Sequence, residues 1–283
     1  MESIRSSRYY SVRVITVRAV LYVLLFAGAA IMLLPFFWMV TTSFKSSSEV
    51  MQMPPQWIPS TWLWSNYAKA WSVAPFARYF FNSFFMAITT TIGEVITTIM
   101  AAYAFAKMKF FGKNALFAVL LATLMIPGQM LLIPNYVTIN RLGWFDRYEA
   151  LIIPWLASVF GIFLLRQFFR SIPDELLDAA RIDGCSRLRF LWRIVVPLSK
   201  PAIMTVALLK FLGSWNSFQW VLLMTNREAM RTVPVGLMSF RSEVGTAYEL
   251  LMAAAVLAII PVLILFFFTQ KQFIQGVART GIK

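Results

Sequence analysis

The sequence predicts an all-α membrane protein with six transmembrane helices. Mean hydropathy is +0.70, and 59% of the 283 residues are hydrophobic. Charged residues make up 13% of the chain, which is about half the share found in soluble proteins. Several uncharged runs also exceed the ~20 apolar residues that a helix needs to cross a bilayer. We therefore expect a chain embedded in a lipid bilayer, with no room for a large soluble domain.

Six apolar stretches account for the expected crossings. They cover residues 19–44, 81–106, 114–140, 149–168, 199–225 and 249–270. The uncharged run from Ala19 to Phe44 is too long for the apolar part of a secretory signal peptide, so we expect it to be retained as the first span. The chain then divides into an N-terminal segment (1–18), a transmembrane domain (19–270) and a C-terminal tail (271–283).

The distribution of positive charge predicts the orientation of these spans. The formal net charge is +14, which by itself is also typical of nucleic-acid-binding proteins. Roughly two-thirds of the 26 Lys and Arg residues, however, lie before span one, between spans two and three, beside the loop between spans four and five, or after span six. That pattern follows the positive-inside rule, so we expect both termini in the cytoplasm and no nucleic-acid partner.

The chain lacks the residues that several classes of protein require. It has no histidine and a single cysteine, Cys185, which excludes His-based catalysis, most zinc sites and an intrachain disulfide. It also lacks a G-x-x-x-x-G-K-[ST] phosphate loop, so it does not hydrolyse ATP by that route. We expect no catalytic residues, no metal site and no cofactor bound by this chain.

A charged stretch between spans four and five has the pattern of a helix, a tight turn and a second helix. Ser171 is placed to cap the first helix, with Asp174 three residues later as in a capping box. Gly184 suits a left-handed turn, and Ser186 suits the cap of the second helix. Pro197 should end or bend that helix. A DNA-binding helix-turn-helix shares the glycine turn, but flanking membrane spans and an apolar second helix argue against it.

This stretch resembles the cytoplasmic loop of ABC-importer membrane subunits, which reads E-A-A, three residues, G, nine residues, I-x-L-P. Here Asp178-Ala179-Ala180, Gly184 and Ile194-Val195-Val196-Pro197 keep both spacings, with Asp for Glu and Val for Leu. In that family the loop is a coupling helix that docks on an ATPase subunit. The resemblance implies a type I importer permease fold, a coupling loop at 171–198 and the following coupling residues: Glu175, Asp178, Ala179, Ala180, Asp183, Gly184, Ile194 and Pro197.

Other segments are similar to the maltose-type carbohydrate branch of the same family. They are the run MIPGQMLLIPNY in span three, SWNSFQW at 214–220, TVPVGL at 232–237 and the tail at 270–283. This resemblance implies a bacterial or archaeal cytoplasmic membrane complex. Its other members would be a second permease, two copies of an ATPase that carries ATP and Mg²⁺, and an external solute-binding protein. The tail Gly276–Lys283 would reach between the ATPase subunits.

Two ionisable residues lie within the spans, where a charge costs at least ~2.5–3.5 kcal/mol. Glu94 in span two and Lys210 in span five should lie at similar depths, so we expect them to pair or to face the solute pathway. The alternative is that Lys210 snorkels or binds backbone carbonyls.

Further pathway candidates are Gln129 in span three and a group in span five. In a continuous helix Trp215 and Gln219 would share one face, and Asn216 and Trp220 another. Indole faces and amides suit sugar rings, although simple helix packing explains the same residues. The resemblance places most sugar contacts on the partner permease.

The function predicted from these observations is ATP-driven import of a sugar or oligosaccharide. The first alternative is a permease of the same kind for a non-sugar solute, such as glycerol-phosphate or a peptide. The second alternative is an ATP-independent channel or an intramembrane enzyme, which the absence of histidine and of an acid pair within the spans disfavours.

Overall fold

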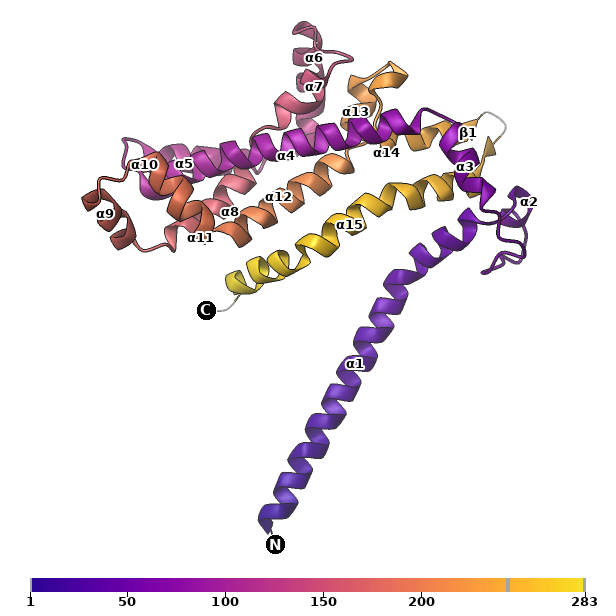
Figure 1. Cartoon of the computed structure of the whole chain (residues 1–283), viewed down its shortest axis with the longest axis horizontal. Helices are drawn as coiled ribbons and strands as arrows, with labels where there is room; N and C mark the ends of the chain where they lie inside the picture. The colour runs from indigo at the N-terminus through magenta and orange to yellow at the C-terminus, as the bar shows by residue number, and fades with distance from the viewer. Residues whose placement is uncertain (1, 243–244, 282–283) are drawn as a thin grey trace. The chain divides into compact units, whose positions relative to one another are not determined.

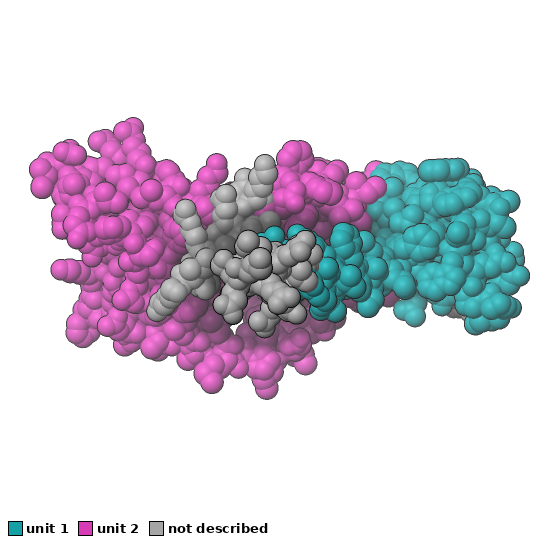
Figure 2. All heavy atoms as spheres, turned by 90° about the horizontal axis from the view of Figure 1, so that it is seen from below, with its two compact units in different colours: residues 1–73, 240–257 teal, residues 74–239, 258–283 magenta. Residues whose placement is uncertain are grey.

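The computed structural model describes the backbone of residues 2–242 and 245–281, and the side chains of residues 16–241 and 245–270. Figure 1 shows the helices along the chain. The chain forms two compact units, residues 1–73 with 240–257 and residues 74–239 with 258–283, which are coloured separately in Figure 2. The predicted terminal segments fall largely outside the described side chains, although helix α1 begins at Glu2 and helix α15 continues to Gly281.

The first unit is built on one long helix and a segment that folds back on its end. Its elements are α1 (Glu2–Ser43), α2 (Ser47–Val50), α3 (Ser65–Ser72), the antiparallel pair β1 (Arg241–Ser242) and β2 (Gly245–Thr246), and the first turns of α15 (Tyr248–Gly281). The buried Lys45 donates to the carbonyl of Gln56 and lies 4.1 Å from the ring centroid of Trp38. The amide of Asn66 donates to the carbonyls of Ser43 and Lys45 at 3.0 and 2.8 Å. The bond to Ser43 satisfies the carbonyl of the last residue of α1, which has no partner within the helix.

The second unit centres on α4 (Phe76–Lys107), which packs along α8 (Val159–Arg170) and α12 (Lys200–Trp215). The three helices lie side by side in Figure 1. Gly161 allows α8 to approach α4 closely, because an added Cβ would lie 3.1 Å from the methyl group of Thr98. Small residues at a crossing are the usual means of close helix packing in membranes. Ile99, Leu165 and Val206, one from each helix, belong to the same buried cluster.

Short elements connect and cover this three-helix core. They are α5 (Lys113–Thr123), η1 (Gly128–Leu131), α6 (Leu132–Arg141), α7 (Tyr148–Ile152), η2 (Ile153–Trp155), α9 (Asp174–Ile182), α10 (Arg187–Phe190), the π-helical turn η3 (Leu191–Val195), α11 (Val196–Leu198), α13 (Gln219–Met224), η4 (Glu228–Met230), α14 (Val233–Gly236) and η5 (Leu237–Phe240). The rest of α15 also belongs to this unit.

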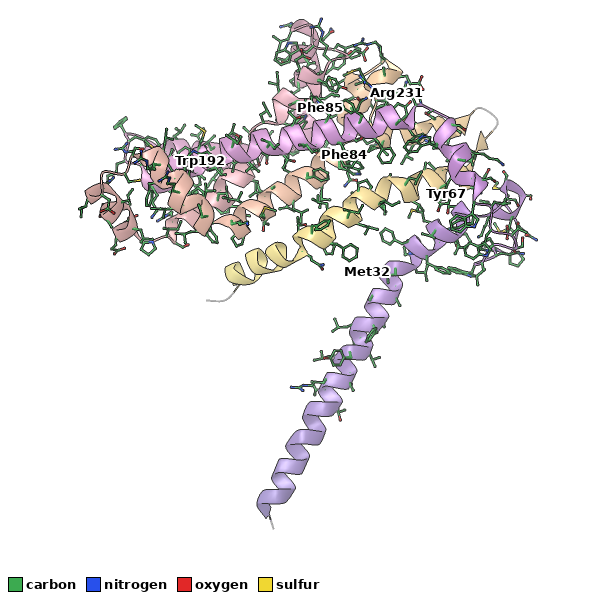
Figure 3. All side chains as sticks on the ribbon, in the orientation of Figure 1. Met32, Tyr67, Phe84, Phe85, Trp192 and Arg231 are labelled. Atoms are coloured by element: carbon green, nitrogen blue, oxygen red, sulfur yellow. The ribbon has the colours of Figure 1, made fainter. Side chains whose placement is uncertain are left out.

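The beginning of α4 is tied to the segment that follows α13. The side-chain amide of Asn82, fully buried, donates to the carbonyls of Ala229 and Arg231, both at 2.8 Å. Tyr148 donates its hydroxyl to the carbonyl oxygen of the same amide at 2.6 Å. Phe84 and Phe85 lie on different sides of α4 (Figure 3), Phe84 against Trp215 and Phe85 against Tyr148. The start of α4 is therefore held by both polar and aromatic contacts.

The predicted all-α membrane fold is confirmed. Four described segments are long and apolar enough to cross a membrane: Thr16–Ser43, Phe76–Lys107, Tyr148–Arg170 and Tyr248–Gln270. Two further pairs qualify jointly but are bent, Lys113–Thr123 with Gly128–Arg141 by 89°, and Arg187–Leu198 with Lys200–Trp215 by 82°. Six spans result if each bent pair is counted as one.

The structure corrects two details of the predicted spans. Span three, expected as one stretch at 114–140, is interrupted after Thr123, and Pro127 precedes the short turn η1. Pro134 does not interrupt α6, because this proline lies in the first turn of the helix, where its missing N–H costs nothing. The predicted continuous helix at 199–225 is wrong. Helix α12 ends at Trp215, and α13 begins only at Gln219. Asn216 and Ser217 favour local turns over helix, which accounts for the break.

The close approach of α14 to α4 generates a prediction about stability. A Cβ on Gly236 would lie 2.3 Å from the ring of Tyr79, which is fully buried and donates its hydroxyl to Glu228 at 2.9 Å. The Tyr79 ring cannot move aside easily, because it is buried and its hydroxyl is hydrogen-bonded. Gly236→Ala should therefore destabilise the protein by about 1–3 kcal/mol. Gly28→Ala is the matched control, since a Cβ there meets no atom within 4 Å. Thermal unfolding of the detergent-solubilised variants measures the effect, and equal midpoints would contradict it.

Candidate functional site

The predicted glycine turn lies between α9 and α10 and forms the corner of an elbow, defined here as residues 174–198. Gly184 has φ +70°, a left-handed conformation that other residues adopt only with strain. The N–H of Cys185 bonds the carbonyl of Ala180 at 2.8 Å, and that of Gly184 bonds the carbonyl of Arg181 at 3.0 Å. These bonds close the end of α9 in the way typical of a glycine-terminated helix.

The predicted capping box at Ser171 is wrong. Ser171 is the C-terminal cap of α8, and its hydroxyl donates to the carbonyl of Phe168 at 2.7 Å. Helix α9 starts at Asp174, directly after Pro173. The reason is that a residue before proline is disfavoured in helical conformation, so Ile172 cannot open the helix. Asp174 and Glu175 nevertheless occupy the first turn, where the helix dipole favours negative charge.

Helix α9 buries one face and exposes the other. Leu177 and Ala180 belong to the buried cluster that contains Ile99 and Leu165 of α4 and α8. The remaining residues predicted to couple on this helix and at its end are exposed: Glu175, Asp178, Ala179, Asp183 and Gly184. Asp178 and Arg181, three residues apart on the helix, form an ion pair at 3.0 Å. The exposed face also carries Ile182, 87% exposed, beside the turn.

The second arm of the elbow is irregular, and its proline explains why. Ser186 caps α10, as predicted, by accepting the N–H of Arg189 at 3.3 Å. The π-helical turn η3 follows and contains Ile194, which is half-buried. Pro197 supplies no N–H to the helical ladder, so the regular α pattern is lost around it. After Leu198 the chain bends by 82° into α12, which confirms the predicted bend. Trp192, labelled in Figure 3, is exposed on this arm.

A residue that the sequence did not single out, Lys107, joins α4 to the elbow. Its ammonium donates to the carbonyl of Ile172 at 2.5 Å and to the carboxylate of Asp174 at 2.6 Å. Only 4% of the Lys107 side chain is exposed, against 77% for Asp174. The hydrogen bond and charge of Lys107 lower the pKa of Asp174, so the stability contributed by this carboxylate is lost as pH falls through its folded-state pKa.

Glu94 of α4 and Lys210 of α12 form an ion pair, with 2.7 Å between Oε2 and Nζ. The expected pairing is therefore observed, and the snorkelling alternative for Lys210 is not. Only 7% and 12% of the two side chains are exposed. Both line a cavity of about 420 Å³, together with residues of η2, α8 and the end of α12. The ammonium of Lys210 also lies 5.6 Å from the ring centroid of Trp155, which lines the same cavity.

The other predicted pathway residues are not brought to this cavity. Trp215 is 2% exposed and packs against Phe80, Phe84 and Phe211. Gln129, Asn216 and Gln219 are exposed and do not line the cavity. The predicted shared faces of Trp215 with Gln219 and of Asn216 with Trp220 are wrong, because the helix is interrupted between these residues. The cavity residues Val206, Lys210, Gly213, Ser214 and Ser217 do follow a helical spacing, which is the signal that could have revealed them.

The geometry of the ion pair predicts how its variants behave. Glu94→Ala leaves a buried ammonium without its partner, and Lys210→Ala leaves a buried carboxylate, so each should cost about 3–5 kcal/mol. The exchange Glu94→Lys with Lys210→Glu retains opposite charges and should recover a substantial part of this loss. Thermal unfolding of the two single variants and of the exchanged protein tests the pairing. An exchanged protein no more stable than the single variants would show that the contact itself contributes nothing.

The contacts of Lys107 predict unequal effects on stability for two substitutions, one of Lys107 itself and one of its partner Asp174. Lys107→Met leaves the carbonyl of the buried Ile172 unpaired and should cost about 1–3 kcal/mol. Asp174→Asn removes only an exposed charge and should cost less than about 1 kcal/mol. The difference appears as a larger drop in the unfolding temperature of the lysine variant. Equal drops in unfolding temperature would show that the bond from Lys107 to the carbonyl of Ile172 does not contribute to stability.

Comparison with known proteins identifies the kind of molecule to which this architecture belongs. Residues 94–279 match the family described as binding-protein-dependent transport system inner membrane component. A permease of the sn-glycerol-3-phosphate transport system from Yersinia enterocolitica, UgpE, is 35% identical over 263 residues, covering 90% of this chain and 94% of the relative. An arabinooligosaccharides transport permease from Bacillus subtilis, AraQ, is 34% identical over 254 residues, covering 89% and 90%.

A solved structure agrees with these sequence matches. It is a bacterial ABC transporter involved in the import of the acidic polysaccharide alginate, one chain of which matches with a TM-score of 0.81 and 26% identity over 90% of this chain and 95% of that one. The resemblance predicted from the Asp178–Pro197 spacing is confirmed. The chain belongs to the binding-protein-dependent transport system inner membrane components, the permease subunits of ABC importers, in which ATP hydrolysis is carried out by a separate subunit.

Proposed function

We propose that this permease forms, with a second and homologous permease, the membrane path for a sugar or oligosaccharide delivered by an external solute-binding protein. Two copies of an ATPase subunit, which bind ATP and Mg²⁺, would drive the cycle from the cytoplasmic face. In this proposal the chain itself binds no cofactor. Its contribution is to receive the ATPase movement and to pass it to the transmembrane helices.

The proposed orientation places the elbow and the Lys107 end of α4 in the cytoplasm of a bacterial or archaeal cell. The excess of Lys and Arg on the same side as the elbow supports this orientation. Both termini then lie in the cytoplasm. The segment after α13, with Glu228 and Arg231, lies on the external side, where a solute-binding protein approaches. The tail Gly276–Lys283, whose last two residues fall outside the described part of the chain, would reach toward the ATPase.

The observation that carries the proposal is the form of the elbow. One face of α9 is packed into the core by Leu177 and Ala180, and its start is bonded to α4 by Lys107. The opposite face is exposed, acidic at Glu175, Asp178 and Asp183, and ends in the exposed Ile182. A surface that is free on one side and rigidly attached on the other is what mechanical coupling requires. The coupling roles of Ile194 and Pro197 would be to shape the second arm.

A sugar is proposed as the solute because two of the three relatives described above are named for saccharides, arabinooligosaccharides and alginate. The alternative is a phosphorylated polyol, supported by the 35% identity to the glycerol-phosphate permease. Both alternatives use the same coupling device. They differ in whether the solute carries a phosphate group.

The left-handed turn at Gly184 provides the test of coupling. Gly184→Val should strain the corner without a clash, because a Cβ there meets no atom within 4 Å. A cost of about 1–2 kcal/mol at the corner should lower co-purification of the ATPase with the tagged chain about tenfold. Gly184→Asn is the matched control, since asparagine tolerates this conformation and should retain the ATPase.

Two results would contradict the proposal. A valine variant that retains the ATPase as well as the wild-type chain does would rule out the elbow as the docking site. A wild-type chain that is purified from its own membranes without any ATPase, or that moves solute alone in proteoliposomes, would rule out the ATP-driven mechanism.

A further inference from the structure

The cavity beside the ion pair has the size and lining of a small-molecule site. Its volume of about 420 Å³ lies within the ~300–1,000 Å³ typical of such sites. Most of its lining is apolar, and its polar groups converge from different elements: Glu94 from α4, Ser158 at the start of α8, Lys210 from α12 and Ser217 beyond its end. An apolar cavity with a few convergent polar groups is the usual form of a binding site.

The two charges of this cavity cancel. Among its lining residues, the carboxylate of Glu94 and the ammonium of Lys210 are the only charged groups, and they are 2.7 Å apart. A phosphate or carboxylate placed here would meet a lysine that is already neutralised, and a carboxylate that repels it. The cavity therefore offers no net attraction for an anion.

The ion pair still has hydrogen-bonding capacity for a neutral ligand. An ammonium has three donors and a carboxylate two acceptor oxygens, and the ion pair joins one donor of Lys210 to one oxygen of Glu94. The remaining donors and the second oxygen suit adjacent hydroxyl groups, which act as acceptor and donor together. Hydrogen bonds to charged groups are the stronger kind, so a polyhydroxyl ligand benefits from the pair without carrying charge itself.

The same cavity offers an aromatic face. Trp155 is 41% exposed. Its ring is fixed by an edge-to-face contact with Trp220, in which the ring centroids are 5.5 Å apart. Trp220 is in turn held by a hydrogen bond from its indole N–H to the carbonyl of Ala150 at 3.0 Å. A fixed and partly exposed indole suits the apolar C–H face of a sugar ring.

We propose that this cavity is a subsite for a neutral saccharide, with Trp155 stacking on a sugar ring and the Glu94–Lys210 pair binding its hydroxyls. The inference rests on the proposed import function and names the class of solute within it. It also assigns a saccharide contact to this permease itself. It disfavours both a glycerol-phosphate and an acidic polysaccharide as the solute held at this position.

The test measures binding to the full chain, purified into nanodiscs of phosphatidylethanolamine and phosphatidylglycerol. Saturation-transfer NMR titrations would use maltotriose and arabinotriose as neutral probes, and trigalacturonate and sn-glycerol-3-phosphate as anionic ones. We expect the neutral saccharides to bind at least about tenfold more tightly than the anions, and Trp155→Ala to weaken their binding about tenfold. Glu94→Gln, which frees the charge of Lys210, should shift the preference toward trigalacturonate.

A cavity-filling variant supplies the matched control. Gly213 lines the cavity, and a Cβ built on it meets no atom within 4 Å, so Gly213→Leu should occupy free volume without disturbing the fold and should abolish saccharide binding. Gly28→Leu, at an equally open position of α1, should leave binding unchanged. Unaltered thermal unfolding of the two leucine variants shows that both are folded.

Several results would overturn the inference. These are tighter binding of the anions by the wild-type chain, no binding of any probe, or saccharide binding that survives Gly213→Leu. Native mass spectrometry could instead find a bound phospholipid that is lost in Gly213→Leu but kept in Gly28→Leu. If maltotriose does not displace this phospholipid, the cavity is a lipid site. Co-purification of the ATPase depends on the elbow and not on the cavity. Failure of saccharide binding with the ATPase retained would therefore reject this inference alone.

Discussion

The structure depends on one constraint, which is that polar groups placed in an apolar medium must find partners within the protein. Helix α4 carries such groups along its length, and four of them bond residues of other elements. Asn82 bonds the segment after α13, Thr90 bonds Ser214 at 2.7 Å, Glu94 pairs with Lys210, and Lys107 bonds the start of the elbow. Apolar packing alone would let helices slide past one another in lipid, whereas these bonds fix their register.

This arrangement has a mechanical consequence. Helix α4 has 32 residues and is about 48 Å long, which is long enough to cross a bilayer. In the proposed mechanism, a displacement of the elbow would pull on Lys107, and the continuous helix would transmit it to Asn82 and the segment bonded there. The ion pair of Glu94 lies between these two ends. On this proposal, an ATPase movement would reach both the cavity and the far end of α4 through one helix, without a separate relay.

Sequence reasoning succeeded where the determining interaction is local or is imposed by the membrane. The conformation of Gly184 and the cap by Ser186 follow from residues within one turn, and the pairing of Glu94 with Lys210 follows from the cost of an isolated charge at similar depth. It failed where residues distant in sequence decide. Lys107 appeared only as one of several basic residues in a loop, because its acceptor lies 65 residues away at Ile172. The end of α12 at Trp215 was likewise hidden by the continuous hydrophobicity of the segment.

A comparison of two glycines, Gly161 and Gly213, shows why the cavity could not be predicted from composition. In membrane helices small residues usually mark close packing, and Gly161 does so, because an added Cβ would lie only 3.1 Å from Thr98 of α4. Gly213 has the same residue type on the adjacent helix, yet no atom approaches the position of its missing side chain. The first glycine brings α8 against α4, and the second leaves space beside Lys210. Because the helices are locked together at Gly161 and at the ion pair, they cannot collapse into the space at Gly213, and an open volume lined by opposite charges persists within the bundle.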